Sequence, residues 1–239
     1  MSVYSNKEIL AAIDNGTIVC TPFNSKNVSE ASLDFTLGFN FYKQEYDEIS
    51  RVYNPFDEAE VDRYFKGPLT AVPHAEWCKR HGFREFQNIP PDHPIIVLKP
   101  GERILAHTHE FVGIRAHGGA AEVKSRSSWG RNGVAVCFDA GWVDPGYINR
   151  ITLEIYNLNK HESVVLPVGE RIGQLIFHHT GPVDGGYASG RGGMSGKYQH
   201  TDDLDELIKT WQPEMMLPRA FKDNRHKPME IPGLSEGIL

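Results

Sequence analysis

The sequence is poor in cysteine, and its few cysteines form no pattern. Cys20, Cys78 and Cys137 lie far apart in a chain of 239 residues, and no C-x-x-C pair occurs. An odd number of widely spaced cysteines predicts neither a disulfide framework nor a thiolate zinc site.

Long apolar runs and positive charge are also scarce. No stretch of about 18 apolar residues occurs, so no membrane span is expected. The first residues, MSVYSNKEIL, have neither the basic nor the apolar region of a signal peptide. The formal net charge is −6, whereas domains that hold nucleic acid by bulk electrostatics are usually basic. These absences predict a cytoplasmic protein that binds neither nucleic acid nor membrane, but they leave room for a small polyphosphate ligand.

Turn-forming residues, by contrast, are abundant and separate short β-rich runs. The chain has 23 glycines and 15 prolines. From about residue 95, runs such as ERILAHTHEFVGI, RITLEIYNL and RIGQLIFHHT are separated by Gly, Pro or Asn. This rhythm is typical of an all-β barrel or double sheet.

The N-terminal part predicts one helix and one strand. Ser5 and Glu8 form the sequence pattern of a capping box, which opens a short helix that Gly16 ends. Residues 31–41, ASLDFTLGFNF, alternate in polarity and are predicted to form a strand.

Three segments interrupt or follow the β-rich part. Residues 43–92 have no clear period and are interpreted as an irregular insertion with a short helix near residues 57–65. Residues 184–196 are rich in Gly and Ser and are expected to be mobile. Residues 200–239 begin with a helix-like run and end rich in proline.

The segment KSRSSWGRNG, residues 124–133, concentrates donors for an anion. Two guanidinium groups, Arg126 and Arg131, flank two hydroxyls, Ser127 and Ser128. Hydroxyls and backbone N–H groups at a helix start, with forked arginine donors, suit phosphate oxygens. A capped surface helix with solvated charges explains the same residues.

A second segment, residues 140–157, contains two carboxylates. In the strand after Asn149, the side chains of Ile151, Leu153 and Ile155 face one way, and those of Thr152, Glu154 and Tyr156 face the other. Glu154 therefore stands opposite the apolar face, where a solvated glutamate is also common. Asp144 lies in an Asp-Pro-Gly turn that is ordinary by itself.

In this order and spacing, SRSSWGR, AGWVDPGY and ITLE resemble the dCTP deaminase branch of the dUTPase superfamily. ERILAHTHEFVGI before them and LPVGERIGQLIF and GKYQ after them extend the resemblance, as do SNKEILAAIDNGTI and ASLDFTLG near the N-terminus. It covers about residues 1–42 and 95–200.

The resemblance implies a mainly β fold, a dUTPase-like distorted β-barrel or jelly roll with a short N-terminal helix and peripheral helices. It also implies a homotrimer whose active sites lie between subunits. Residues 1–200 would form the nucleotide-processing domain, including the insertion at about 43–92, and residues 201–239 a C-terminal extension.

The resemblance also assigns roles to residues. The triphosphate would be bound by the motif that contains Arg126, Ser127, Ser128, Trp129, Gly130 and Arg131. Asp144 would lie near the deoxyribose 3′-hydroxyl, and Tyr147 would pack on the sugar and disfavour a ribose. Residues 196–199, GKYQ, correspond to the closing segment of the family. The other predicted substrate-binding residues are Thr152, Leu153 and Glu154 on the strand, Tyr187, and Lys197 and Tyr198 on the closing segment. The spacing between Tyr187 and the closing segment is longer than usual in the family.

Glu154 favours a deaminase over a simple dUTPase, in which that strand position is apolar. The predicted reaction is hydrolysis of dCTP to dUTP and ammonia. Glu154 would activate water for attack at cytosine C4 and then protonate the leaving ammonia. Ser127 would orient the water and Arg131 would neutralise charge, so these three residues form the predicted catalytic set.

A zinc-dependent deaminase needs an H-x-E stretch paired with P-C-x-x-C. The chain has HTHE at residues 107–110 but no C-x-x-C, so a zinc-independent enzyme is predicted. Mg²⁺ is expected to accompany the triphosphate, held by substrate oxygens and water and not by protein ligands.

Several alternatives remain open at this point. One alternative is a bifunctional enzyme that continues from dUTP to dUMP and pyrophosphate, and another is a deaminase that acts on dCTP modified at C5. For each of them dTTP is a candidate inhibitor. A silent nucleotide-binding regulator on the same fold is a different class. The chain departs from the family pattern at Trp129, at Asn149, where Gly is usual, and at His200 and Thr201 after the closing segment.

Overall fold

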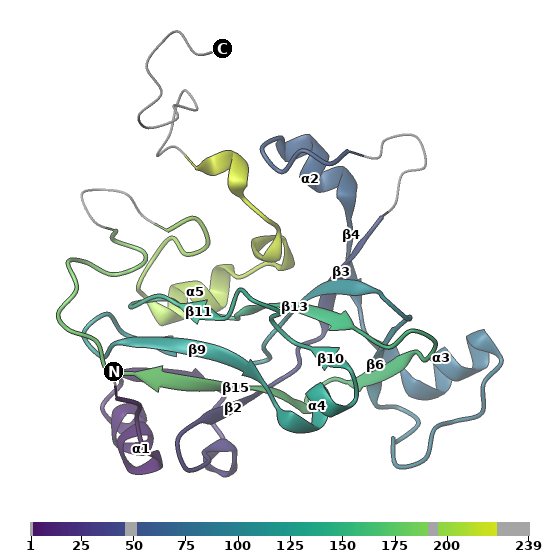
Figure 1. Ribbon diagram of the computed structural model, residues 1–239, viewed down its shortest axis with the longest axis horizontal. Helices are drawn as coiled ribbons and strands as arrows, with labels where there is room; N and C mark the ends of the chain where they lie inside the picture. The colour runs from purple at the N-terminus through teal and green to yellow at the C-terminus, as the bar shows by residue number, and fades with distance from the viewer. Residues whose placement is uncertain (1, 46–51, 191–195, 224–239) are drawn as a thin grey trace, which may run out of the picture.

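The computed structural model describes residues 2–45, 52–190 and 196–223 (Figure 1). The helices are α1 (Asn6–Asp14), α2 (Glu58–Tyr64), α3 (His74–His81), α4 (Ser127–Arg131) and α5 (Leu204–Thr210), with 3₁₀ turns η1 (Ser25–Asn27), η2 (Pro213–Met216) and η3 (Ala220–Lys222). Figure 1 shows strands forming the body, with α1 and α3 at opposite ends of the view and α2 at its top.

The strands form four antiparallel sheets. In spatial order, the first holds β1 (Ile18–Thr21), β8 (Phe111–Ile114) and β12 (Ile148–Asn149). The second holds β10 (Val134–Ala135), β13 (Thr152–Asn157), β7 (Arg103–His107), β3 (Asn40–Gln44) and β4 (Phe65–Thr70). The third holds β11 (Trp142–Val143), β9 (Ala120–Ser125), β15 (Arg171–His178) and β2 (Leu33–Thr36), and the fourth β14 (Val164–Pro167), β6 (Pro94–Leu98) and β5 (Val72–Pro73). The predicted mainly β fold is confirmed.

One large apolar cluster lies between these sheets. Its fully buried side chains include Phe35, Phe177, Leu153, Ile104 and Ile114, each at most 1% exposed. They come from the five strands β2, β15, β13, β7 and β8, which belong to three of the sheets. The core therefore forms only when these sheets pack together. Removing this apolar surface from water is the main favourable contribution to folding.

The N-terminal predictions are confirmed for the helix and only in part for the strand. Ser5 and Glu8 form the capping box of α1, with the Ser5 N–H donating to Glu8 Oε2 at 2.8 Å. The predicted single strand 31–41 is two strands, β2 and the start of β3. The break falls at Gly38, where a Cβ would overlap the His107 ring, so only glycine permits this turn against β7.

The insertion is more regular than the sequence indicated. The predicted helix near 57–65 is confirmed as α2, but residues 65–81 form β4, β5 and α3 instead of irregular structure. The Gly67-Pro68 pair hides the strand in the sequence. The structure tolerates the proline because β4 is an edge strand whose free side needs no ladder hydrogen bond.

The C-terminal segment packs onto the sheets. Helix α5 confirms the helix-like run, and Asp203 caps it by accepting from the Asp205 and Glu206 N–H groups. After α5, the Trp211 ring lies 4.7 Å from the buried His107 ring and 4.8 Å from the Arg150 guanidinium. The division of the chain at residue 200 stays a prediction.

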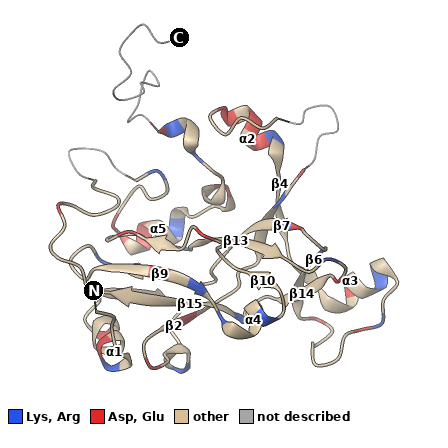
Figure 2. Cartoon of the chain, in the orientation of Figure 1, with Lys and Arg blue, Asp and Glu red and all other residues tan. Residues whose placement is uncertain are grey.

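Two other predictions fall partly outside the described residues. The stretch expected to be mobile, 184–196, includes residues 191–195, and the C-terminal extension includes residues 224–239; neither range is described. Within the described ranges, no helix is both long and apolar enough to cross a bilayer. Figure 2 shows the Lys and Arg residues at several separate places, among them α3 and α4.

Gly113 allows β12 to lie close to β8, and we predict that it cannot be replaced without cost. A Cβ there would overlap the Tyr147 carbonyl oxygen and lie 2.9 Å from Ile148 Cα. Gly113→Ala should therefore lower the free energy of unfolding by about 1–3 kcal/mol through overpacking. Denaturant unfolding measures this, with Gly181→Ala as the control, since a Cβ at Gly181 meets nothing within 4 Å. Equal stability of the two variants would contradict this packing.

Candidate active site

A pocket of about 430 Å³ opens beside strand β13. Its lining comes from β4, β7, β9, β11 and β13, from the loops next to β11 and β13, and from the chain after β15. The lining residues are Phe65, Arg103, Leu105, Val123, Ala140, Trp142, Val143, Asp144, Tyr147, Ile151, Thr152, Glu154, Tyr187, Tyr198, Met216 and Pro218. Six predicted site residues are therefore brought together: Asp144, Tyr147, Thr152, Glu154, Tyr187 and Tyr198.

Strand β13 holds Glu154 in this pocket. The strand alternates as expected, with Leu153 and Ile155 fully buried in the core and Glu154 on the other face. Pairing with β7 places Glu154 opposite Leu105. The Glu154 Oε2 atom is buried and has no hydrogen-bond partner in the structure. A buried acceptor without a partner is costly, so it marks a position where a ligand or water is needed.

Burial changes the acidity of this carboxyl. Desolvation raises the pKa of Glu154 to about 7, while its own backbone N–H and the nearby Arg103 guanidinium act in the opposite direction. At neutral pH both protonation states are then populated. A carboxyl in this range can accept a proton from water and return it to a leaving group.

The turn after β11 carries Asp144 and Tyr147. The Tyr147 N–H donates to the Asp144 carbonyl oxygen at 3.0 Å, and the Trp142 Nε1–H donates to Asp144 Oδ1 at 3.2 Å. Burial raises the pKa of the Tyr147 hydroxyl, which therefore stays protonated. The Tyr187 ring meets the Tyr147 ring edge-on at 4.8 Å. The turn thus presents a carboxylate beside an aromatic surface.

Two buried amides that the sequence did not single out as site residues tie the closing segment to this turn. The Ile148 N–H donates to Gln199 Oε1 at 2.7 Å, and Gln199 Nε2 donates to the Gly146 carbonyl oxygen at 3.1 Å. Asn149 Nδ2 donates to the Tyr198 carbonyl oxygen at 3.1 Å. Asn149, a departure from the family pattern, therefore positions Tyr198, which a glycine could not do.

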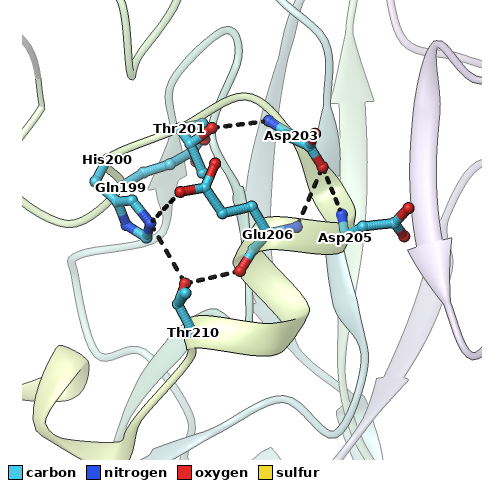
Figure 3. A network of polar contacts seen from close by, with 7 residues as sticks. All are labelled: Gln199, His200, Thr201, Asp203, Asp205, Glu206 and Thr210. Atoms are coloured by element: carbon cyan, nitrogen blue, oxygen red, sulfur yellow. Dashed lines mark hydrogen bonds and ion pairs between the residues drawn. The ribbon is translucent and has the colours of Figure 1, made fainter.

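The departures at Thr201 and His200 contact the start and the end of α5, respectively (Figure 3). Thr201 Oγ1 accepts from the Asp203 N–H at 3.2 Å, next to the cap of the helix. His200 Nε2 lies 3.3 Å from Thr210 Oγ1, which donates to the Glu206 carbonyl oxygen. The residues after the closing segment thus begin a helix that anchors it.

The predicted phosphate motif does not line the pocket of the same chain. Ser127, Ser128, Gly130 and Arg131 are exposed on α4. Arg126 forms an ion pair of 3.2 Å with the buried Asp34. These positions leave hydroxyl and guanidinium groups on the outside of the chain.

Three further predicted residues also point elsewhere. Leu153 is buried in the core on the face opposite Glu154, because strand side chains alternate, so its side chain cannot touch a ligand in this pocket. Trp129 packs against the core, and its Nε1–H donates to the Arg171 carbonyl oxygen at 3.0 Å. Lys197 forms an ion pair of 3.3 Å with Asp223.

Residues that the sequence analysis missed form one side of the pocket. Arg103, Leu105, Phe65, Met216 and Pro218 come from β7, β4 and the C-terminal segment. No sequence pattern marks them, since their proximity to Glu154 depends on strand pairing and on the packing of distant segments. Among the described residues, no group of three or more His, Cys, Asp or Glu side chains is placed to hold a metal ion. Zinc independence stays a prediction.

The fold and the pocket define a mainly β protein with a buried carboxyl suited to acid–base chemistry. The model of a family described as dCTP deaminase-like matches residues 3–180. A protein named dCTP deaminase, dUMP-forming, from Methanopyrus kandleri is 32% identical over 208 residues, which are 85% of this chain and 93% of that protein. A protein of the same name from Corynebacterium jeikeium is 32% identical over 197 residues, 82% of this chain and 90% of that protein. The chain therefore belongs to the dCTP deaminase-like family.

A solved structure supports the fold. The 2′-deoxycytidine 5′-triphosphate deaminase from Agrobacterium tumefaciens is similar with a TM-score of 0.50 at 19% identity. The match covers 73% of this chain but 47% of that one, so this chain spans less than half its length. The family model and the named relatives confirm the resemblance drawn from the sequence and the enzyme class that it implied.

The raised pKa of Glu154 predicts a specific dependence of stability on pH. A carboxyl whose pKa is higher in the folded state loses stability as pH rises from the unfolded value, 4.5, through about 7. Glu154→Gln removes this loss, so its stability relative to the wild type should increase by about 1–3 kcal/mol between pH 4.5 and pH 8. Urea unfolding at both pH values measures the change, with exposed Glu85→Gln as the control. A relative stability that is the same at both pH values would contradict the burial of this charge.

Proposed function

We propose that this protein hydrolyses dCTP to dUMP, pyrophosphate and ammonia, with Glu154 as the base of the deamination step. The observation that carries the proposal is the buried Glu154 carboxyl, which has an unpartnered Oε2 and a pKa of about 7. The names of the relatives, dUMP-forming deaminases, favour the bifunctional alternative over the product dUTP that the sequence analysis preferred.

In the first step, Glu154 takes a proton from a water molecule as the oxygen attacks C4 of cytosine. The carboxyl then returns the proton to the amino group, the C4–N bond breaks and ammonia leaves. The second proton of the water moves from the new C4 hydroxyl to N3, which leaves the C4 carbonyl and the N3–H of uracil. A carboxyl whose pKa is near the working pH suits both transfers, because it can accept the proton from water and donate it to the amino group without a large free-energy cost in either direction.

In the second step, a further water attacks the α-phosphorus of the bound dUTP. The bond to the β-phosphate oxygen breaks, and pyrophosphate and dUMP leave. Asp144 is the carboxylate available for this water, and the Trp142 hydrogen bond to Oδ1 fixes its orientation. Two waters are consumed in total, one at C4 and one at phosphorus.

The sugar would lie beside the turn that carries Asp144 and Tyr147. The Tyr147 ring offers an apolar surface for deoxyribose. The close approach of the Tyr147 backbone carbonyl to Gly113 of β8 leaves the turn little freedom to move. A ribose 2′-hydroxyl directed at such a ring would lose its hydrogen bonds to water without gaining one to the protein. This free-energy cost would favour deoxyribose over ribose.

The surface position of the predicted triphosphate-binding residues supports an assembly of several copies of the chain. Ser127, Ser128 and Arg131 lie on the surface of one chain and outside its pocket. We infer that α4 of a neighbouring subunit completes each site in a homotrimer, where Arg131 neutralises phosphate charge and Ser127 orients water. Mg²⁺ would travel with the triphosphate, bound mainly by its oxygens and by water. dTTP, which shares the sugar and the triphosphate, is a candidate inhibitor of the same site.

A catalytically silent nucleotide-binding regulator is less well supported. Binding alone needs donors for phosphate and an aromatic surface for the sugar. It does not need a buried pocket carboxyl with one unpartnered oxygen, because such a group destabilises the fold once it is ionised.

Glu154→Gln should keep the shape of the pocket and bind nucleotide, yet lower ammonia release from dCTP by about 100-fold or more, as expected when a general base is lost. Chromatographic separation of products from dCTP and dUTP measures both steps. The wild type should give dUMP and pyrophosphate from each substrate. Near-normal ammonia release by the variant would refute the role of Glu154, and accumulation of dUTP by the wild type would restore the monofunctional alternative.

The shared site predicts complementation between two inactive variants. Glu154→Gln and Arg131→Ala should each be inactive alone. Mixed trimers formed after joint refolding should contain about a quarter of sites with both native residues, because these come from different subunits. Steady-state ammonia release by the mixture, against each variant refolded alone, measures this. A mixture as inactive as its components would show that Glu154 and Arg131 of one chain serve the same site.

A further inference from the structure

A second apolar cluster lies apart from the main core. Its buried members are Tyr42, Val61, Phe65, Leu105 and Met216, and its half-buried members are Tyr53, Tyr64, Leu217 and Phe221. Most of these residues come from the insertion or from the C-terminal segment, the two parts of the chain that lie outside the short motifs that identified the family. The two segments therefore pack against each other and against β7.

This cluster forms one wall of the reaction pocket. Phe65 and Met216, from its two separate segments, line the pocket together with Leu105 of β7. Pro218 continues the wall toward the closing segment, where the Arg219 N–H donates to the Tyr198 hydroxyl at 3.2 Å. The wall thus borders the same pocket as the carboxyl of Glu154, which pairs across the sheet with Leu105.

The wall also carries a cation, Arg103. It lies opposite Tyr156 in the pairing of β7 with β13, two residues from the pair of Leu105 and Glu154. Its guanidinium stands 5.5 Å from the centre of the Tyr156 ring. With the amide oxygen of Gln44 turned toward it, Arg103 Nε donates to that oxygen at 2.7 Å, and the Tyr64 hydroxyl donates to the same oxygen at 3.1 Å. A residue of the insertion therefore helps to hold the guanidinium in place.

The position of Arg103 relative to a bound base rests on the proposed function. Cytosine carries its sugar on N1, across the ring from C4, and C5 is bonded to C4. With the sugar at Tyr147 and C4 at Glu154, the base points along the strands toward Arg103. Same-face neighbours on a strand are roughly 7 Å apart. In this arrangement the guanidinium and the apolar wall lie beyond the C4 end of the base, where N3 and C5 are the neighbouring ring atoms.

We propose that this wall selects the substituent at C5, and that the site prefers a deoxycytidine triphosphate with a small hydroxyl-bearing group there, such as hydroxymethyl. A hydroxyl oxygen can accept from the guanidinium N–H groups that Gln44 does not bind, whereas hydrogen or methyl at C5 offers them no acceptor. Sites built to hydrogen-bond a substrate group discriminate strongly against analogues that lack it.

The test compares kcat/KM for ammonia release from 5-hydroxymethyl-dCTP, 5-methyl-dCTP and dCTP. The wild type should prefer the hydroxymethyl substrate over dCTP by about tenfold or more, and Arg103→Met should reduce that ratio by about tenfold. The matched control is Arg84→Met, at an exposed residue outside the pocket, which should keep the wild-type ratio. A wild-type ratio near one, or a ratio that Arg103→Met leaves unchanged, would overturn the inference.

A second variant probes the apolar part of the wall and keeps the test decisive if Arg103→Met does not fold. Met216→Ala opens the wall from the C-terminal side and should raise kcat/KM for 5-methyl-dCTP relative to dCTP by several-fold; an unchanged ratio would count against the wall. Ammonia release from none of the three substrates would overturn the proposed function itself. Release from dCTP without discrimination at C5 would overturn only this inference.

Discussion

The pairing of β13 with β7 connects the core of this protein to its pocket. Because strand side chains alternate, the register that buries Leu153 and Ile155 also fixes Glu154 on the other face. A slip by one residue would place the carboxyl in the core and the aliphatic residues in the pocket. The apolar core therefore supplies the free energy that holds a desolvated carboxyl in position. The desolvation raises the pKa of Glu154.

The rest of the pocket is arranged around this strand by hydrogen bonds. Gln199 and Asn149 connect the closing segment to the turn of Asp144 and Tyr147, and α5 anchors that segment beyond Gln199. The exposed α4 stands apart from these contacts, as a site completed by a second copy would require. Within one chain, then, the residues proposed to act on the base and sugar are grouped, and those proposed to act on the triphosphate face outward.

The features that local sequence determines were predicted well. Alternation predicted the two faces of β13, the capping box predicted α1, and ordered short motifs identified the family. Contacts between distant segments were not predictable in this way. β4 is hidden by Gly67-Pro68, and the role of Asn149 depends on a carbonyl 49 residues away. Arg103 and Met216 meet beside Glu154 only because β7, the insertion and the C-terminal segment pack together. The sequence placed Leu153 among the binding residues, but its side chain lies in the core.

The account depends most on the state of one carboxyl, and a direct titration tests it. Carbon-13 NMR of the glutamate side chains, with Glu154→Gln to assign the signal, gives the pKa of Glu154 in the ligand-free protein. A value of about 7 is expected from its burial. A bound nucleotide that contacts the carboxyl should shift this titration. A value at the ordinary glutamate pKa, unaffected by nucleotide, would contradict the assignment of Glu154 as the buried base.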